Sequence, residues 1–438
     1  MSDILIVGAG SAGSVLAERL SAEQSCRVTV LEAGPGPDDA LMRRLTADAT
    51  ALPIGPDSPV ARSYPTTLTD HPPRTADIVR GSCLGGSGAV NGGYFRLPAA
   101  ADIAALPGWS WPELEEHGSA LLDTIPVHPL REFCPVTEQF IAAARDCGYG
   151  WLPDLDTADR IAGVGPVPLN ITGGERIGPG AAFLVPALGR PNLTVLTMTS
   201  ATRVRIAGGR AVGVDALAPD GPVRIDADAV VLSAGAIASA QLLMLSGIGP
   251  ADQLAALGIP VIADLPVGRR CADHPEQVIA VGWPADAGRP VLEAVLLVDG
   301  LEIRPYTRGF GGGPPQIGVA VMAPQARGRV SLVSADPSAP PRIEHRYDSE
   351  PGDTAALAAG CGRVADLFGG VIDLGAPQWS TSQHLCGTAP MGEVTDARCR
   401  VFGIQGLSVV DGSVLAGIPA RGPHGMIAAL AHRAAEFF

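Results

Sequence analysis

The chain has 438 residues, and its 31 basic and 45 acidic side chains give a formal net charge of −14. This length allows two domains, whereas the acidic excess argues against nucleic acid as a partner, because nucleic acid is bound by basic faces. No apolar run approaches the roughly eighteen residues that span a membrane, and the eight cysteines form no CxxC pair of the kind that indicates zinc ligands.

The chain opens directly into an apolar strand, without the pattern of a signal peptide. We therefore expect a cytoplasmic protein with reduced thiols and no bound metal. Peripheral contact with the inner face of the membrane stays open, because it requires no spanning segment.

Residues 4–34 form a dinucleotide-binding fingerprint of strand, glycine turn, helix, strand and acid. An apolar strand is predicted over 4–7 and a second over 28–31, which ends at Glu32. The strand–turn–helix setting makes this motif far more specific than three spaced glycines alone.

Each part of the fingerprint has a physical role. Gly8 permits the tight turn, Gly10 allows the backbone to approach a pyrophosphate, and Gly13 allows the helix to pack closely on the sheet. The helix N-terminus attracts phosphate groups. Glu32 can accept a hydrogen bond from a ribose hydroxyl and would repel a 2′-phosphate, which argues against NADP. The motif does not separate FAD from NAD.

The next segments contain few regular elements. A weak helix is predicted near 38–46, and the chain from there to Pro73 has the composition of a loop. The stretch 78–96 then contains six glycines, a density that disfavours regular structure and suggests backbone lying against a ligand. Helices are predicted after Ser110 and over 137–150.

The middle of the chain is rich in strands, with a hairpin at Gly208-Gly209. Strands are predicted over 193–199, 202–206, 211–216 and 227–232. The last strand leads into Ala234 and Gly235, where small residues would again allow the backbone to approach a ligand, and then into a helix that ends at Leu245.

The pattern changes between about 275 and 375, where several strand-like runs and a helix near 353–368 predict an antiparallel sheet. The strand-like runs cover 278–282, 291–298, 316–322 and 329–332. After about 380 the chain returns to glycine turns, a strand over 407–410 and a final helix over 425–438.

We therefore expect an α/β fold with a discontinuous, Rossmann-like nucleotide-binding domain and a second α+β domain built on an antiparallel sheet. The nucleotide-binding domain would comprise 1–274 and 376–438, with excursions near 40–75 and 110–165. The second, substrate-binding domain would comprise 275–375.

Motifs from both ends and the middle of the chain resemble the glucose–methanol–choline (GMC) flavin oxidoreductases over almost the whole length. They are the fingerprint of 4–34, GSCLGGSGAVN over 81–91, GAIASAQLLMLSGIG over 235–249, LPVGR over 265–269 followed by Asp273-His274, HxxGTxxMG over 384–392, and VVDGS over 409–413. The resemblance implies a bound FAD and oxidation of a CH–OH group by hydride transfer to the flavin.

The resemblance also implies which residues meet FAD. The segment 81–91 should lie along the pyrophosphate and flavin, the backbone of Val204 by the adenine, and Asp411 by the pyrophosphate and flavin edge. Some members attach FAD through a histidine at the position of Val90, so we expect non-covalent FAD. The expected FAD contacts are Gly8, Gly10, Ser11, Ala12, Gly13, Glu32, Ala33, Gly81, Gly85, Gly86, Ser87, Val90, Asn91, Gly92, Val204, Ala234, Gly235, Asp411, Gly412, Pro423 and His424.

His384 matches the catalytic histidine of the family, and histidine suits a base because its ordinary pKa of about 6.5 lies near neutral pH. The family usually has a second histidine or an asparagine just before the last helix, but that position is Gly422 here. Either His424 takes this second catalytic role or the group is missing. We interpret His274 as structural and the remaining histidines as surface or satisfied residues.

The stretch 86–95 and the compact length resemble the mycofactocin-associated subgroup. That resemblance implies oxidation of the reduced redox cofactor mycofactocin. Electrons would pass to a quinone or another component of the respiratory chain rather than to oxygen.

Three other functions stay open at this point. Some members of this fold keep FAD structurally and act as lyases through the histidine. A chain without a working second group could be a non-catalytic flavin electron carrier, and an NAD-dependent dehydrogenase would share the fingerprint of 4–34.

Overall fold

The computed structural model describes residues 2–104, 106–157, 161–286, 288–310 and 313–438. Its first layer is a parallel five-stranded sheet with the strand order β11-β2-β1-β15-β25. The strands are β1 (Ser2–Val7), β2 (Cys26–Leu31), β11 (Leu193–Leu196), β15 (Ala229–Leu232) and β25 (Leu407–Val409). The Rossmann-like sheet that the sequence predicted is thus confirmed, and its strands come from both ends of the chain.

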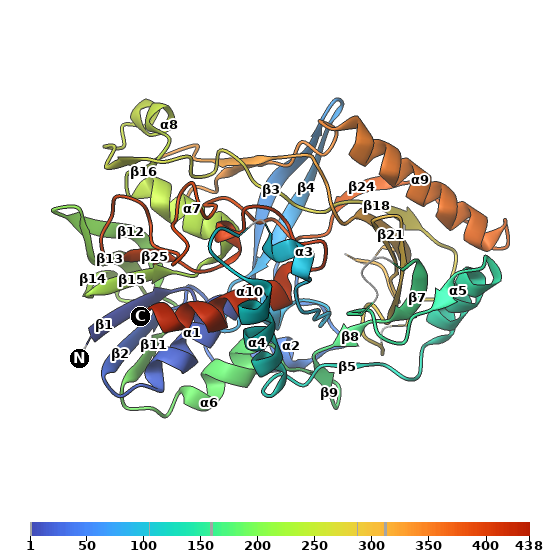
Figure 1. Ribbon diagram of the computed structural model, residues 1–438, viewed down its shortest axis with the longest axis horizontal. Helices are drawn as coiled ribbons and strands as arrows, with labels where there is room; N and C mark the ends of the chain where they lie inside the picture. Colours follow the sequence, from blue (N-terminus) through green and yellow to red (C-terminus); the bar gives the residue numbers. More distant parts are fainter. Residues whose placement is uncertain (1, 105, 158–160, 287, 311–312) are drawn as a thin grey trace.

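Helices cover this sheet because their apolar faces must be buried (Figure 1). They include α1 (Ser11–Ser21), α7 (Gly235–Leu245) and α10 (Pro423–Ala434). Helix α10 packs against α1 and against α4 (Trp111–Leu122). The C-terminal helix is therefore held beside the N-terminal fingerprint, and the two chain ends lie close together (Figure 1).

An antiparallel three-stranded sheet adjoins this layer and turns at Gly208-Gly209, as predicted. Its strands are β12 (Ser200–Ala207), β13 (Arg210–Ala218) and β14 (Gly221–Asp226). Strand β14 was not predicted, because its sequence GPVRID leaves mainly exposed residues and no apolar alternation.

The loop predicted up to Pro73 is wrong, because residues 61–81 form a long antiparallel hairpin. Strands β3 (Ala61–Asp70) and β4 (Pro73–Gly81) join β23 (Arg342–Glu344) and β22 (Arg329–Ser331) in a four-stranded sheet. The buried face of β3 carries two threonines, whose β-branched side chains suit a strand although they are polar. This hairpin leads directly into the glycine-rich stretch.

A seven-stranded sheet forms the second layer, with the order β24-β18-β21-β20-β19-β7-β6. Its strands are β6 (Gly150–Trp151), β7 (Gly163–Pro166), β18 (Pro275–Ala280), β19 (Ala294–Val298), β20 (Leu301–Pro305), β21 (Gln316–Val321) and β24 (Gln378–Thr381). Helices α5 (Pro135–Asp146) and α9 (Pro351–Phe368) pack on it and share its apolar core. The sheet also takes strands from outside 275–375.

The run predicted as a strand over 329–332 lies in the four-stranded sheet and not in this one. Strand β20 was missed because its sequence LEIRP places a glutamate and an arginine at fully buried positions. The two charges pair with each other, and a pairing of this kind cannot be recognised from hydrophobic alternation.

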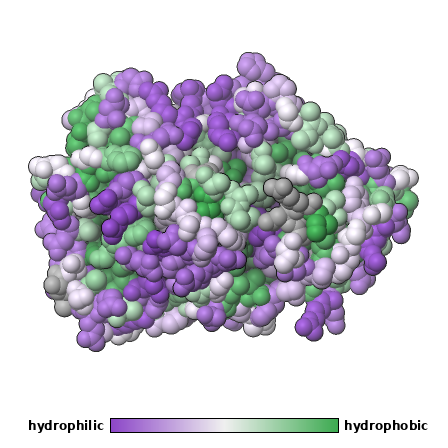
Figure 2. Space-filling model, viewed as in Figure 1, coloured by the Kyte–Doolittle hydropathy of each residue, from purple (hydrophilic) through white to green (hydrophobic). Residues whose placement is uncertain are grey.

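Polar and apolar side chains are intermixed over the face of the molecule shown in Figure 2. Among the described residues, none of the helices combines the length and apolar character needed to cross a bilayer. Within the same ranges, no three or more histidine, cysteine or acidic side chains are grouped so as to hold a metal ion.

Candidate active site

Two glycine loops meet at the end of β1. A Cβ atom at Gly13 would lie 1.9 Å from the Gly8 carbonyl oxygen, so the helix can approach the strand only because this residue is glycine. The second loop follows β4, and a Cβ atom at Gly86 would lie 2.7 Å from the Gly10 Cα. The amide of Gly85 donates to the carbonyl of Ala9 at 2.8 Å. The two predicted motifs are thus in direct contact.

The first turn of α1 offers free backbone donors. Gly10 is its N-cap, no side chain caps the turn, and the turn contains no acidic residue. An uncapped helix N-terminus of this kind favours an anion such as a pyrophosphate. Its glycine surroundings leave room for a ligand to approach the backbone.

Glu32 lies at the end of β2, where it is 6% exposed. Its carboxylate accepts hydrogen bonds from the amides of Ala9 at 3.0 Å and Gly34 at 2.9 Å. Burial raises the pKa of Glu32 to about 7, and these backbone bonds oppose the rise. A carboxylate held by two amides still has lone pairs to accept from a ribose hydroxyl. The donor and acceptor set therefore fits a dinucleotide.

Asp411 joins the C-terminal segment to this region. Its carboxylate accepts from the Gly235 amide at 2.8 Å, from the Ser239 hydroxyl at 2.6 Å and from the Ser413 amide at 2.8 Å. Burial raises the pKa of Asp411, although these hydrogen bonds favour the ionised form. Gly235 and Gly412 are thereby fixed beside the Rossmann-like sheet.

Val204 is buried in β12, and its amide donates to the Ser246 hydroxyl at 2.8 Å. The expected contact between the Val204 backbone and an adenine stays a prediction. The other residues expected to meet the cofactor lie at the ends of strands, in the loops that follow strands or in the first turns of α1 and α10, namely Ser11, Ala12, Ala33, Gly81, Ser87, Val90, Asn91, Gly92, Ala234 and Pro423. Their contacts with a cofactor stay a prediction.

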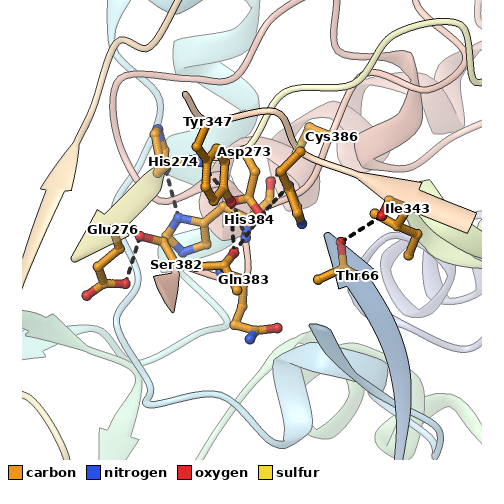
Figure 3. Close-up of polar contacts among 12 residues, drawn as sticks. Thr66, Asp273, His274, Glu276, Ile343, Tyr347, Ser382, Gln383, His384 and Cys386 are labelled. Carbon is orange, nitrogen blue, oxygen red and sulfur yellow. Dashed lines mark hydrogen bonds and ion pairs between the residues drawn. The ribbon is translucent and has the colours of Figure 1, made fainter. Parts of the chain in front are cut away.

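His384 follows β24 and is partly exposed. Its Nδ1 lies 2.8 Å from His274 Nδ1, and its amide donates to Asp273 at 2.8 Å (Figure 3). Burial, with the nearby guanidinium groups of Arg304 and Arg80, lowers the pKa of His384 well below its usual value. The imidazole is therefore neutral at physiological pH and can accept a proton.

Gly422, the N-cap of α10, lies directly beside this imidazole. A Cβ atom at Gly422 would lie 3.8 Å from His384 Cε1 and 3.9 Å from Nε2. The backbone here has φ −54° and ψ 134°, which any residue adopts. Glycine is thus not required by the turn, and its lack of a side chain leaves space next to His384.

His424 has both ring nitrogens engaged away from His384. Asn91 Nδ2 lies 3.1 Å from His424 Nδ1, and Ser11 Oγ lies 3.1 Å from His424 Nε2. Asn91 accepts from the Gly93 amide through Oδ1, so its NH₂ group faces the imidazole. His424 therefore connects α10 with the glycine loops, an arrangement that suits a cofactor contact better than a second base.

A buried network of ionised and hydroxyl groups forms the wall on the side of the second sheet. Arg304 donates to Ser382 at 2.8 Å and pairs with Glu302 and Glu276 at 2.6 and 3.5 Å. The Ser382 hydroxyl donates to Glu276 at 3.1 Å (Figure 3). These buried charges pair with one another, because a buried charge without a partner would destabilise the fold.

Sequence reasoning did not foresee the contact between His274 and His384. The two residues are 110 positions apart, and His274 was interpreted as structural. Its place in a short motif after Asp273 was the one feature that could have drawn attention to it. Spatial proximity of this kind depends on tertiary packing and not on local pattern.

Sequence models of the GMC oxidoreductase family match residues 2–276 and 324–431. An uncharacterized GMC-type oxidoreductase of Rhodococcus erythropolis is 38% identical, with 99% of this chain and 97% of the relative aligned. An alcohol dehydrogenase (acceptor) of Pseudomonas putida is 28% identical over 100% of this chain and 95% of its own. A crystal structure of pyridoxine 4-oxidase from Mesorbium loti matches with a TM-score of 0.88 and 27% identity, over 100% of this chain and 99% of that chain.

Proposed function

Because the chain belongs to the GMC oxidoreductase family, we propose that it binds FAD and oxidises the CH–OH group of an alcohol, with His384 as the base. GMC oxidoreductases bind FAD. Relatives carry the names alcohol dehydrogenase, oxygen-dependent choline dehydrogenase and pyridoxine 4-oxidase. The uncapped turn of α1, the buried Glu32 and the two glycine loops fit the adenosine and pyrophosphate of such a cofactor.

The observation that carries the proposal is the neutral, partly exposed imidazole of His384 beside the turn at Gly422. None of the hydrogen bonds within the described ranges uses His384 Nε2, which leaves this atom for a substrate. Two residues after Gly422, His424 contacts Ser11 at the start of α1. The turn at 422–424 thus lies beside His384 and also contacts the start of α1, where the cofactor is expected to bind.

In the proposed reaction His384 Nε2 takes the proton of the substrate hydroxyl. The carbon that bears this hydroxyl loses a hydride, for which FAD, when bound, supplies the acceptor. The C–O bond thereby becomes a carbonyl. The space beside Gly422 accommodates the reacting end of the alcohol, and general-base assistance of this kind is worth about 10²–10⁴-fold in rate.

Anaerobic mixing of the FAD-loaded protein with a panel of alcohols tests this function. Bleaching of the flavin absorbance by an alcohol, with the carbonyl product formed in equal amount, supports it. Turnover of a cyanohydrin-type substrate while the flavin stays oxidised would instead indicate a lyase. A flavin that no alcohol reduces would indicate an electron carrier.

Reduced mycofactocin belongs in that panel, because the stretch 86–95 resembles that of the mycofactocin-associated subgroup. On this proposal the electrons pass on to a quinone or another respiratory-chain component. Reoxidation of the reduced protein with oxygen, quinones and dyes ranks the acceptors. Release of flavin on denaturation by acid tests whether FAD is held non-covalently, as Val90 implies.

A further inference from the structure

His274 is fully buried beneath His384 and contacts two groups through its ring. Its Nε2 lies 2.9 Å from the carbonyl oxygen of Pro419, and its Nδ1 lies 2.8 Å from His384 Nδ1. The two rings meet edge to face, with an interplanar angle of 88°. Figure 3 shows His274 directed at the imidazole of His384.

These partners determine where the protons lie. A carbonyl oxygen only accepts hydrogen bonds, so His274 Nε2 must carry its proton. Burial lowers the pKa of His274 to about 4, so the ring is neutral and its Nδ1 is a bare acceptor. His384 Nδ1 must then be the donor in the bond between the rings. A neutral His384 with its proton on Nδ1 has a bare lone pair on Nε2.

The backbone around the pair is fixed by one carboxylate. Asp273 Oδ1 accepts from the amides of both His274 and His384, each at 2.8 Å. Its second oxygen accepts from the Thr381 hydroxyl at 2.8 Å. The two histidine-bearing segments therefore cannot separate without breaking buried hydrogen bonds. These bonds keep the two imidazole rings at hydrogen-bonding distance.

We propose that His274 is a positioning residue that keeps His384 in the tautomer with the proton on Nδ1 and stabilises the imidazolium that forms when Nε2 takes a proton. This inference rests on the proposed function of His384 as the base. The hydrogen bond from Nδ1 becomes charge-assisted in the imidazolium and therefore strengthens during the reaction. His274 does not relay the proton, because its other nitrogen ends on the Pro419 carbonyl.

Two substitutions separate this role from packing. His274→Leu removes the acceptor, whereas His274→Asn keeps an oxygen acceptor near the position of Nδ1. His345→Leu is the matched control, since His345 is also buried and lies 3.7 Å from the carboxylate of Asp273, whereas no hydrogen bond among the described residues joins it to His384. Unfolding temperature and flavin content show whether each variant has folded.

The first measurement is the ¹⁵N NMR spectrum of the FAD-loaded protein labelled at histidine, with His384 assigned by its loss in His384→Gln. We expect His384 protonated on Nδ1 in the native protein and a shift toward the Nε2 tautomer in His274→Leu. A native His384 protonated on Nε2 would overturn the inference. This readout decides the tautomer even if no alcohol reduces the flavin, and it remains available on the native protein if His274→Leu does not fold.

The second measurement is anaerobic flavin reduction by the best alcohol of the panel. For His274→Leu we expect the limiting rate constant to fall on the order of 10–100-fold, as loss of a hydrogen bond to a charged group implies, with the substrate Kd within about twofold. His274→Asn should recover most of the rate, and His345→Leu should retain it. An unchanged rate in His274→Leu, or an equal loss in His345→Leu, would refute the positioning role.

Discussion

A neutral base in a buried site needs surroundings that disfavour its charged form until the substrate arrives. At His384, burial and the nearby positive groups disfavour the charged imidazolium and hold the pKa well below the usual range. Gly422 leaves the reacting nitrogen uncovered, and His424 is engaged elsewhere. On the proposed function, His384 would then act without a second imidazole, and the second catalytic role expected for His424 stays a prediction.

The lowered pKa of His384 predicts the pH dependence of flavin reduction. The base is active when unprotonated, so activity is present above its pKa in the folded protein and lost as the pH falls through that value. Because this pKa lies below the ordinary 6.5, the limiting rate constant should stay constant from about pH 8 to below pH 6.5. Stopped-flow reduction across this range measures it. A rate that already declines below pH 7.5 would contradict the assignment.

At the scale of elements, the site depends on the contact between the turn after β1 and the loop after β4. Gly86 has φ +53° and leaves no room for a Cβ atom against Gly10. Gly208 provides a matched control, with φ +56° and no atom within 4 Å of such a Cβ. Both positions share the strain of a left-handed backbone, but one of them also has the steric contact.

We therefore expect Gly86→Ala to separate the two loops and weaken FAD binding, with lower flavin content and a lower unfolding temperature. Gly208→Ala should lower the free energy of unfolding by only about 1–2 kcal/mol and leave the flavin content unchanged, because this substitution adds only backbone strain. Flavin absorbance per protein and thermal unfolding measure both effects. Equal behaviour of the two variants would show that the contact between the loops is unimportant.

The elements that the sequence predicted best are those with strong local patterns. Strands β1 and β15 contain nearly continuous apolar runs, and α1 and α10 follow glycine turns, so their positions were recognisable. Strand β3 was mistaken for a loop because two of its four buried residues, Thr66 and Thr69, are polar. Strand β20 was missed because it carries Glu302 and Arg304 at buried positions, where they pair with each other and Arg304 also pairs with Glu276.

The candidate site, too, was predictable only where a local sequence pattern marks it. The glycine motifs, Glu32 and His384 could be predicted from the sequence because each belongs to a short local pattern. The engagement of His424 by Asn91 and Ser11, and that of His384 by His274, joins segments from distant parts of the chain. Such contacts are set by the packing of α10 and β24 on the two layers, which no local pattern specifies.

At the scale of the whole molecule, burial of neutral histidines predicts sensitivity to acid. Burial lowers the pKa values of His274, His345 and His424 to about 4. In the unfolded chain they titrate near 6.5. The unfolded state therefore binds more protons between these values, and stability is lost as the pH falls from about 6.5 toward 4. Glu32, with a raised pKa, acts in the opposite direction.

His345→Leu isolates one of these contributions. Removing a single such histidine should flatten the pH dependence of the free energy of unfolding by up to about 1.4 kcal/mol per pH unit between pH 6.5 and 4. Urea titrations of the native protein and the variant across this range measure the two slopes. Parallel curves would show that His345 is not held neutral in the folded protein.

The proposed function depends on both ends of the chain, since the fingerprint of 4–34 would bind the cofactor and the C-terminal segment carries His384. The most direct test is anaerobic stopped-flow reduction of the FAD-loaded protein and of His384→Ala by the alcohol that the panel selects. We predict bleaching of the native flavin and a rate at least about 10²-fold lower in His384→Ala, at unchanged flavin content. Reduction of His384→Ala at the native rate would contradict the account.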